Sequence, residues 1–385
     1  MHSSEELSLM IVTLATFLFL SPFLASRFKL PISIIEMVLG AVAGTLHFLH
    51  PQPFFDGLAE FGFLYLMLLA GMEVNLGELF RLNISFYLRG ITFLLLLYLF
   101  SWGIVKLFHY PPVFLVIFPL ISIGLMLSIQ QELGRSQWLQ LALQVGVLGE
   151  LLSIVVFSGI SAYFEYRLSP HFFWTLGILG GILVGVSLLF QGVRALFWWF
   201  PELKYRLMPG EMDRYHQDVR TVAALFFLII IGLMSIHLDL VLGAFLVGVF
   251  VKTFFSHNHQ LEEKLAPFGF GFMIPLFFIH VGTTLNLQLL TLKLFRDAVA
   301  ITLLSVGIRF LTAHLFPFPK EFRLKFALSL SMPLTLMIAT ATIAFKHSFI
   351  SEYWYNVLVA TAILEVVFVM VTLKNLNSPQ QKEER

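Results

Sequence analysis

The chain contains no cysteine and little charge, and both absences narrow what it can be. Without cysteine it has no disulfide bond, no thiolate metal site and no cysteine nucleophile. Charged residues make up 12% of its 385 residues, about half of their share in a soluble domain. The formal net charge of +1 gives no reason to expect nucleic-acid binding. No phosphate-binding P-loop occurs, so ATP hydrolysis is not expected to power this protein, and no enzyme is predicted.

Apolar sequence is what the chain has in excess. Hydrophobic residues make up 58% of it, and runs of about twenty apolar residues recur along its length. These runs predict an all-α polytopic membrane protein with about thirteen transmembrane helices. The first run follows Glu5 and Glu6, and this acidic start predicts a retained span rather than a cleaved signal peptide. The predicted spans are centred near Phe17, Ala41, Met67, Leu96, Ile121, Glu150, Val184, Phe227, Val247, Pro275, Gly307, Pro333 and Ile363.

Lysine and arginine are unevenly distributed between the predicted loops. An odd number of spans places the two termini on opposite sides of the membrane. With the N-terminus outside the cell, roughly three times as many Lys and Arg residues lie in the inside loops as in the outside loops. We therefore expect an outside N-terminus and a cytoplasmic C-terminus, in the inner membrane of a bacterium. Residues 376–385 are expected to form a short cytoplasmic tail.

Similar motifs occur on both sides of a polar stretch, residues 201–218. Gly71-Met72-Glu73-Val74-Asn75-Leu76 in the third span is similar to Gly282-Thr283-Thr284-Leu285-Asn286-Leu287 in the tenth. Gly40-Ala41 with Gly44 in the second is similar to Gly243-Ala244 with Gly248 in the ninth. The matched spans run in opposite directions in the predicted topology. This predicts two inverted six-helix repeats, the arrangement of many secondary transporters.

Three charged residues lie at the centres of predicted spans: Glu150 in the sixth, Arg309 in the eleventh and Glu365 in the thirteenth. Each costs about 2.5–3.5 kcal/mol to insert at such a depth, so each is expected to be paired or functional. A buried carboxyl can bind a proton or, when ionised, a cation, which makes Glu150 the predicted carrier of both. Arg309 keeps its charge. We therefore predict a charge-compensating Arg309–Glu365 ion pair.

Two spans are predicted to be broken at mid-membrane. The twelfth has Pro333 near its centre and the fifth has Ser122 and Gly124. Half-helices that meet within the membrane present carbonyl groups and helix ends to ions. His47 and His50 lie one turn apart, but no carboxylate motif accompanies them, so no metal site or other cofactor is predicted. The predicted cation ligands are Glu150, Ser122, Thr335 and Ser153.

The order of several short motifs resembles the monovalent cation:proton antiporter-2 family, which includes the Kef-type potassium efflux proteins. The motifs are Lys29-Leu30-Pro31 with Glu36 and Gly40, Leu69–Glu73, Gln131–Gly134, Gly243–Gly248 and Leu276–Gly282, and the resemblance covers almost the whole chain. It implies a single exchanger domain over residues 1–375, with broken helices that cross, and a homodimer. Within it, residues 1–80 and 219–290 would form a dimerisation part, 84–165 and 297–374 a moving core, and 172–200 a linker helix.

The chain departs from the family pattern next to the proposed carrier. The family has an aspartate preceded by Asp or Gln where this chain has Glu150 preceded by Gly149, and Ile121 and Ile123 replace Thr and Pro at the fifth-helix break. A single carboxylate there suggests electroneutral exchange, unless Glu365, which is not part of the family pattern, supplies a second acid. The leading hypothesis is exchange of Na⁺ or K⁺ for H⁺ across a lipid bilayer. The alternatives are a cation channel, an organic-anion symporter in which Arg309 binds the anion, or a non-transporting membrane subunit.

Overall fold

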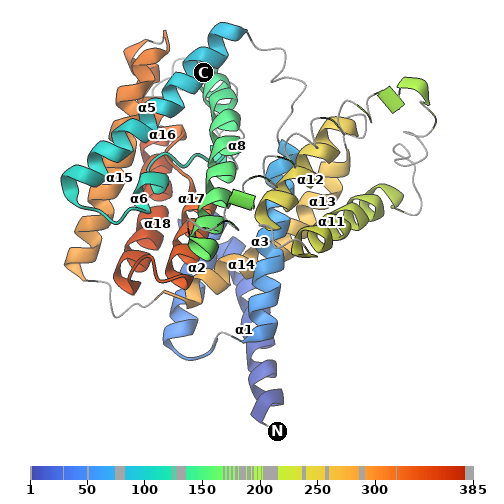
Figure 1. Ribbon diagram of the computed structural model, residues 1–385. Helices are drawn as coiled ribbons and strands as arrows, with labels where there is room; N and C mark the ends of the chain where they lie inside the picture. Colours follow the sequence, from blue (N-terminus) through green and yellow to red (C-terminus); the bar gives the residue numbers. More distant parts are fainter. Residues whose placement is uncertain are drawn as a thin grey trace, which may run out of the picture. The chain divides into compact units, whose positions relative to one another are not determined.

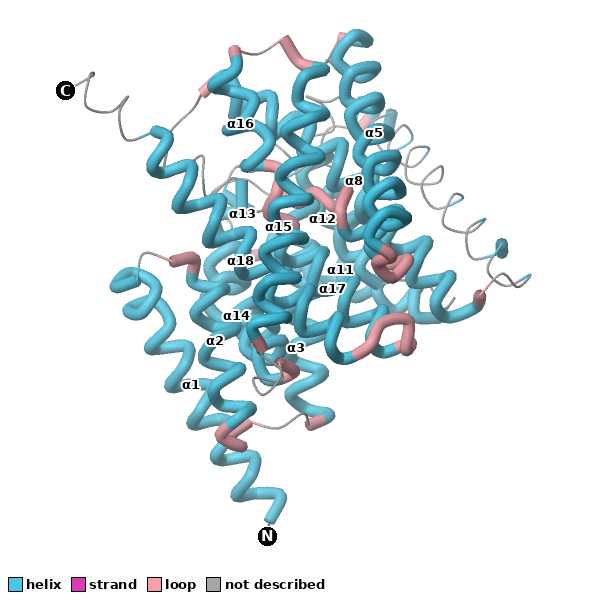
Figure 2. The backbone as a smooth tube through the Cα atoms, turned by 90° about the vertical axis from the view of Figure 1, so that its left-hand side faces the viewer, coloured by secondary structure: helices cyan, strands magenta, loops and turns pink. Residues whose placement is uncertain are grey.

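The computed structural model shows an all-helical chain (Figures 1 and 2). It describes residues 2–28, 30–49, 52–73, 83–123, 125–126, 136–167, 216–235, 240–255, 260–285, 291–317 and 319–377, with scattered positions between 170 and 202. Eight helices in these ranges are long and apolar enough to span a bilayer, and the bent pair α16–α17 makes a ninth. The protein is therefore polytopic, as predicted. The count of thirteen stays a prediction, and the linker helix 172–200 falls largely outside the described residues.

Each of two compact units combines an early and a late part of the chain. Unit 1 comprises Met1–Glu78 and Glu165–Leu287, and unit 2 comprises Leu79–Phe164 and Gln288–Arg385. The helices of unit 1 are α1 (His2–Phe28), α2 (Ile32–Thr45), α3 (Pro53–Glu73), α11 (Gln217–Ser235), α12 (Leu240–Phe254), α13 (Gln260–Phe268), the π-helix η1 (Gly269–Met273) and α14 (Ile274–Thr283). Those of unit 2 are α5 (Ile84–Phe108), α6 (Phe114–Ile117), α8 (Gln137–Tyr166), α15 (Leu292–Thr312), the 3₁₀ turn η3 (Ala313–Leu315), α16 (Lys320–Ser329), α17 (Leu334–Lys346) and α18 (Glu352–Asn377).

Glycine contacts hold α2 against α14 and α3 against α12 in unit 1. A Cβ atom at Gly40 would meet the carbonyl oxygen of Ile279, and one at Gly282 would meet that of Met37. The same reciprocal contact recurs between Gly71 and Gly248, since a Cβ atom at either would meet a backbone carbonyl three residues before the other. Small residues let helix backbones approach closely in membrane proteins, where packing replaces the hydrophobic effect as the main source of association.

The two glycine contacts define a correspondence between the halves of the chain. They match Gly71 with Gly282, as the sequence predicts, but they match Gly40 with Gly248 rather than with Gly243. A Cβ atom at Gly243 would instead meet Leu233 of α11. The sequence-based alignment of the second and ninth spans is therefore shifted by five residues from the one that the contacts favour. The inverted repeat itself stays a prediction.

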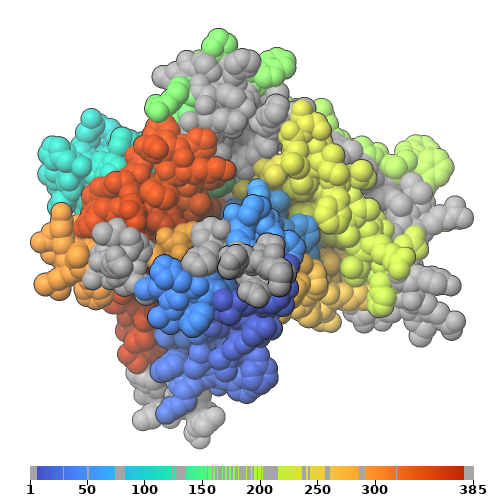
Figure 3. All heavy atoms as spheres, turned by 90° about the horizontal axis from the view of Figure 1, so that it is seen from below, coloured from blue at the N-terminus to red at the C-terminus, as the bar shows by residue number. Residues whose placement is uncertain are grey.

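Apolar side chains cover the outer faces of several helices. Phe19 on α1 is 67% exposed and Leu95 on α5 is 63% exposed. In the space-filling view the atoms of α1, in dark blue, lie at the surface of unit 1 (Figure 3). Large apolar side chains this exposed, along predominantly apolar spans of 22 and 25 residues, are explained by contact with lipid.

Unit 2 contains both breaks that the sequence predicts in the fifth and twelfth spans. After α6 ends at Ile117, the chain is non-helical from Leu120 to Ile123. Between α16 and α17 it bends by 45° over Leu330–Pro333. Within the same unit, α18 packs against α15, α16 and α17.

Candidate functional site

Local chemistry explains why the twelfth span breaks where it does. Pro333 has no N–H to donate and caps the N-terminus of α17. The carbonyl groups at the end of α16 are satisfied by nearby serines, because the Ser329 hydroxyl donates to Phe326 O (2.8 Å) and the Ser331 hydroxyl donates to Ala327 O (2.7 Å). The break therefore leaves these buried carbonyl groups bonded. In the fifth span, the predicted break residue Gly124 lies outside the described residues.

Glu150 lies on α8 and points its carboxyl group at the fifth-span break. The side chain is fully buried. The Ser122 hydroxyl donates to its Oε1 at 3.2 Å, and the Ile123 backbone N–H donates to its Oε2 at 3.3 Å. Both carboxyl oxygens thus face non-helical backbone. A group in this position can bind a proton, or bind a cation together with oxygens of the break.

Ser153, one turn after Glu150, also contacts the break, because its Oγ accepts the backbone N–H of Ile121 at 3.1 Å. The glycines of α8 leave room for this approach. A Cβ atom at Gly149 would meet the Ile121 side chain, and one at Gly146 would meet Ile123, Met126 and, at 3.7 Å, Leu330 of the other break. Ile121 and Gly149, two of the departures from the resembled pattern, therefore fit against each other.

Arg309 on α15 binds the other side of the same break. It is fully buried, its Nη2 donates to Leu120 O at 2.5 Å, and its Nη1 donates to the Ser305 carbonyl at 2.9 Å and the Ser305 hydroxyl at 2.5 Å. Residues 120–123 are thus held between the Arg309 guanidinium on one side and α8 on the other. A permanent cation here compensates the carbonyl dipoles that the break exposes.

The predicted Arg309–Glu365 ion pair is not present in the described part of the chain. Glu365 is fully buried on α18, yet neither of its carboxyl oxygens has a hydrogen-bond partner among the described residues. Both terminal nitrogens of the Arg309 guanidinium donate to Leu120 and Ser305 instead, and the interaction between Arg309 and Glu365 is electrostatic. Thr335, the remaining predicted ligand, lies partly buried in the first turn of α17 and makes no hydrogen bond to Glu150 in the described residues.

Sequence reasoning missed two further buried acids, both in unit 1. Glu36 on α2 is 1% exposed and accepts a 3.4 Å hydrogen bond from the Ser21 hydroxyl of α1. Asp218 at the start of α11 is fully buried and pairs with Lys264 of α13 at 2.5 Å. The position of Glu36 within an apolar run was a usable signal. Asp218 gave none, because it lies at the end of a polar stretch.

Arg309 is expected to tolerate lysine better than alanine. The alanine variant leaves the Leu120 carbonyl without its buried donor, and a hydrogen bond to a charged group contributes about 1.5–3 kcal/mol. We expect a clearly lower melting temperature in detergent for Arg309→Ala and a smaller decrease for Arg309→Lys. Arg296→Ala, on the exposed first part of α15, is the control and should melt like the wild type. Loss of flux in Arg309→Ala at an unchanged melting temperature would instead indicate a direct role in transport.

Comparisons with known proteins agree on one family. The family model "Sodium/hydrogen exchanger, transmembrane" matches residues 13–376. The "Putative Na(+)/H(+) antiporter YjbQ" of Bacillus subtilis is 27% identical over all of this chain, which spans 65% of the length of that relative. The "Probable Na(+)/H(+) antiporter 3" of Methanocaldococcus jannaschii is 27% identical over 77% of each chain. The solved structure of the sodium proton antiporter MjNhaP1 from the same organism has a similar fold, with a TM-score of 0.68, 16% identity and coverage of 97% of this chain and 98% of that one.

Proposed function

Because the chain belongs to the transmembrane sodium/hydrogen exchanger family, we propose that it exchanges Na⁺ or K⁺ for protons by alternating access, with Glu150 as the shared binding site. Membership makes it a membrane transporter rather than an enzyme, and it does not single out the Kef-type proteins. The observation that carries the proposal is a fully buried carboxyl group whose two oxygens face the backbone of a broken span.

In the proposed cycle, a proton and a cation compete for Glu150. When Glu150 is protonated, the site has no carboxylate to attract a cation. When it is ionised, its oxygens can bind a cation together with the hydroxyl oxygens of Ser122, Ser153 and Thr335. Arg309 remains charged throughout and balances the ionised carboxylate in the empty site. Competition of this kind couples the two fluxes, because the carrier crosses loaded with one ion or the other.

The experiment that tests this function uses purified protein in liposomes with an imposed pH gradient. We expect added Na⁺, K⁺ or Li⁺ to dissipate the gradient, and choline to leave it intact. A channel would pass cations without a coupled proton flux, and an organic-anion symporter would need an added carboxylate. A non-transporting subunit would show no flux under any gradient. Each of these three outcomes contradicts cation–proton exchange.

Two further features belong to the same proposal. We infer a homodimer formed through unit 1, as the resemblance implies, with unit 2 as the moving core. We also infer a bacterial inner-membrane location with the N-terminus outside. Cross-linking in native membranes tests the dimer. Labelling of single cysteines introduced near each terminus tests the orientation. Because the chain has no native cysteine, no other residue would react with the thiol label.

A further inference from the structure

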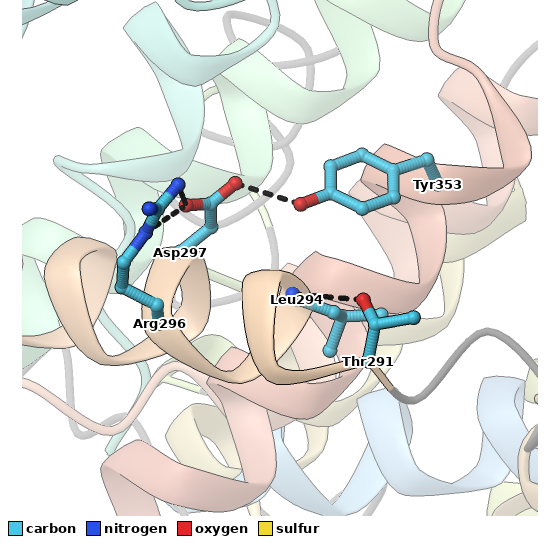
Figure 4. Close-up of polar contacts among 5 residues, drawn as sticks. All are labelled: Thr291, Leu294, Arg296, Asp297 and Tyr353. Atoms are coloured by element: carbon cyan, nitrogen blue, oxygen red, sulfur yellow. Dashed lines mark hydrogen bonds and ion pairs between the residues drawn. The ribbon is translucent and has the colours of Figure 1, made fainter.

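Helices α15 and α18 pack side by side with their polar residues aligned. Near the start of both helices, the Tyr353 hydroxyl donates to Asp297 Oδ2 at 2.7 Å, while Arg296 contacts the other oxygen of Asp297 at 3.2 Å (Figure 4). Twelve residues further along each helix stand Arg309 and Glu365, which interact electrostatically. The two helices therefore run parallel. At 1.5 Å per residue, Glu365 lies about 18 Å from the Asp297–Tyr353 contact.

Further polar groups lie between these two levels. Thr302 and Ser305 on α15 and Thr361 on α18 are all buried. The Thr361 hydroxyl bonds to Val357 O of its own helix, but the Thr302 hydroxyl has no partner among the described residues. Polar groups that only join two membrane helices are expected to bond to each other. The Thr302 hydroxyl and the Glu365 carboxyl group make no such bond in the described residues. A role in joining α15 to α18 therefore does not explain why these two polar residues are buried there.

The surroundings of Glu365 fit a neutral carboxyl group in the conformation described. An ionised carboxylate buried without close hydrogen-bond donors is strongly disfavoured. Glu365 makes no hydrogen bond of normal length in the described residues, and the groups that interact with it are the Arg309 guanidinium and the Ser305 hydroxyl. Among the described residues of the helices packed on α18, Arg309 is the cation that interacts with Glu365, while Lys293 of α15 lies over the Tyr353 ring. On α16, Lys325 interacts with Glu321, and Lys320 and Arg323 lie in the same short helix. Helix α17 has no acidic or basic residue before Lys346.

Arg309 connects Glu365 to the proposed carrier. Its guanidinium donates to Leu120 O, and the next three residues of the break contact α8 through Ser153 and Glu150. A cation that replaces the proton on Glu150 takes the oxygens of Glu150, Ser122 and Ser153, so it must rearrange the contacts between the break and α8. If the Leu120 carbonyl moves away, the freed N–H groups of Arg309 have Glu365 as their nearest acid. Pairing with Arg309 stabilises the ionised form of Glu365, which then releases its proton.

We propose that Glu365 is a second proton-binding residue of the transport cycle, protonated in the conformation described and ionised when a cation occupies Glu150. This inference rests on the proposed exchange function and adds its stoichiometry. Two carboxyl groups that titrate together give about two protons for each cation, so each cycle moves net charge. That differs from the electroneutral exchange that a single carboxylate suggests.

The test measures the proton-to-cation coupling ratio from reversal potentials in liposomes. We expect about two for the wild type and about one for Glu365→Gln, because the amide has nearly the shape of a protonated carboxyl group but releases no proton. Glu352→Gln, at the exposed start of the same helix, should keep the wild-type ratio. Equal ratios in the wild type and Glu365→Gln would overturn this inference and leave the exchange function standing. Absence of coupled flux in the wild type would overturn both.

A second measurement needs no variant and covers the case in which Glu365→Gln does not fold. Calorimetric titration of the wild-type protein with Na⁺ or K⁺, in buffers of different ionisation enthalpy, counts the protons released per cation bound. We expect about two, one from each carboxyl group. Release of about one proton would contradict a role for Glu365 as a proton carrier.

Discussion

Glu150→Gln is expected to reduce cation-dependent proton flux to the level of protein-free liposomes. The amide cannot ionise, so it neither attracts a cation nor carries a proton. Insertion should persist, because the amide oxygen can still accept the Ser122 hydroxyl, while the amide nitrogen cannot accept the Ile123 N–H. Leaving the buried Ile123 N–H without its acceptor costs about 1–3 kcal/mol of stability. Flux by pH-sensitive dye and melting temperature in detergent, measured on the same preparation, check both parts.

Two variants make the Glu150 result specific. Glu150→Asp keeps an ionisable carboxyl group one methylene shorter, and we expect it to retain measurable exchange with altered cation preference. Glu60→Gln on α3 removes an exposed acid of unit 1 and should behave as the wild type. Full flux in Glu150→Gln would show that the carrier lies elsewhere.

Alanine at the close glycine contacts is expected to destabilise unit 1, although alanine normally favours a helix. A Cβ atom at Gly71 or Gly282 would collide with backbone atoms of α12 or α2, and backbone cannot move aside as a flexible side chain can. Overpacking typically costs about 1–3 kcal/mol. We therefore expect lower melting temperatures for Gly71→Ala and Gly282→Ala, each measured by thermal unfolding in detergent.

Gly232 in α11 provides the matched control, because a Cβ atom there would meet nothing within 4 Å. Gly232→Ala should leave the melting temperature unchanged or raise it, since alanine in an exposed helix is favoured over glycine by about 0.5–1 kcal/mol. The prediction is thus a difference in sign between variants with the same change of side chain. Wild-type stability of both Gly71→Ala and Gly282→Ala would mean that these helices do not pack as closely as described.

The breaks and Glu150 could be predicted from sequence because their physics is local. A charge at the centre of an apolar run is expensive, and Pro333 removes a backbone N–H wherever it stands in a helix. The partner of Arg309 could not be predicted in this way. Its guanidinium binds the carbonyl of Leu120, and a free backbone carbonyl is created by the break rather than by any residue type. In the described residues Arg309 therefore donates to Leu120 and Ser305, and its interaction with Glu365 is electrostatic without a direct ion-pair contact.

The alignment of the repeats shows a different limit. Gly40-Ala41 and Gly243-Ala244 share two letters, and sequence similarity favours matching them. The contacts match Gly40 with Gly248 instead, because what the two positions share is a backbone that lies against another backbone. Such a shared environment depends on helices that are distant in the sequence, so single-sequence reasoning could find the glycines but could not choose between them.

Helix α2, which carries Gly40, is shorter than a bilayer is thick. With 14 residues it extends about 21 Å, against about 30 Å of hydrocarbon. Val38 and Val42 of α2 are exposed, so lipid reaches this helix along part of its length. The membrane beside it must become thinner, or headgroups and water must dip toward its ends. We therefore expect this protein to be more stable in lipids with shorter acyl chains, which relieve the mismatch at α2.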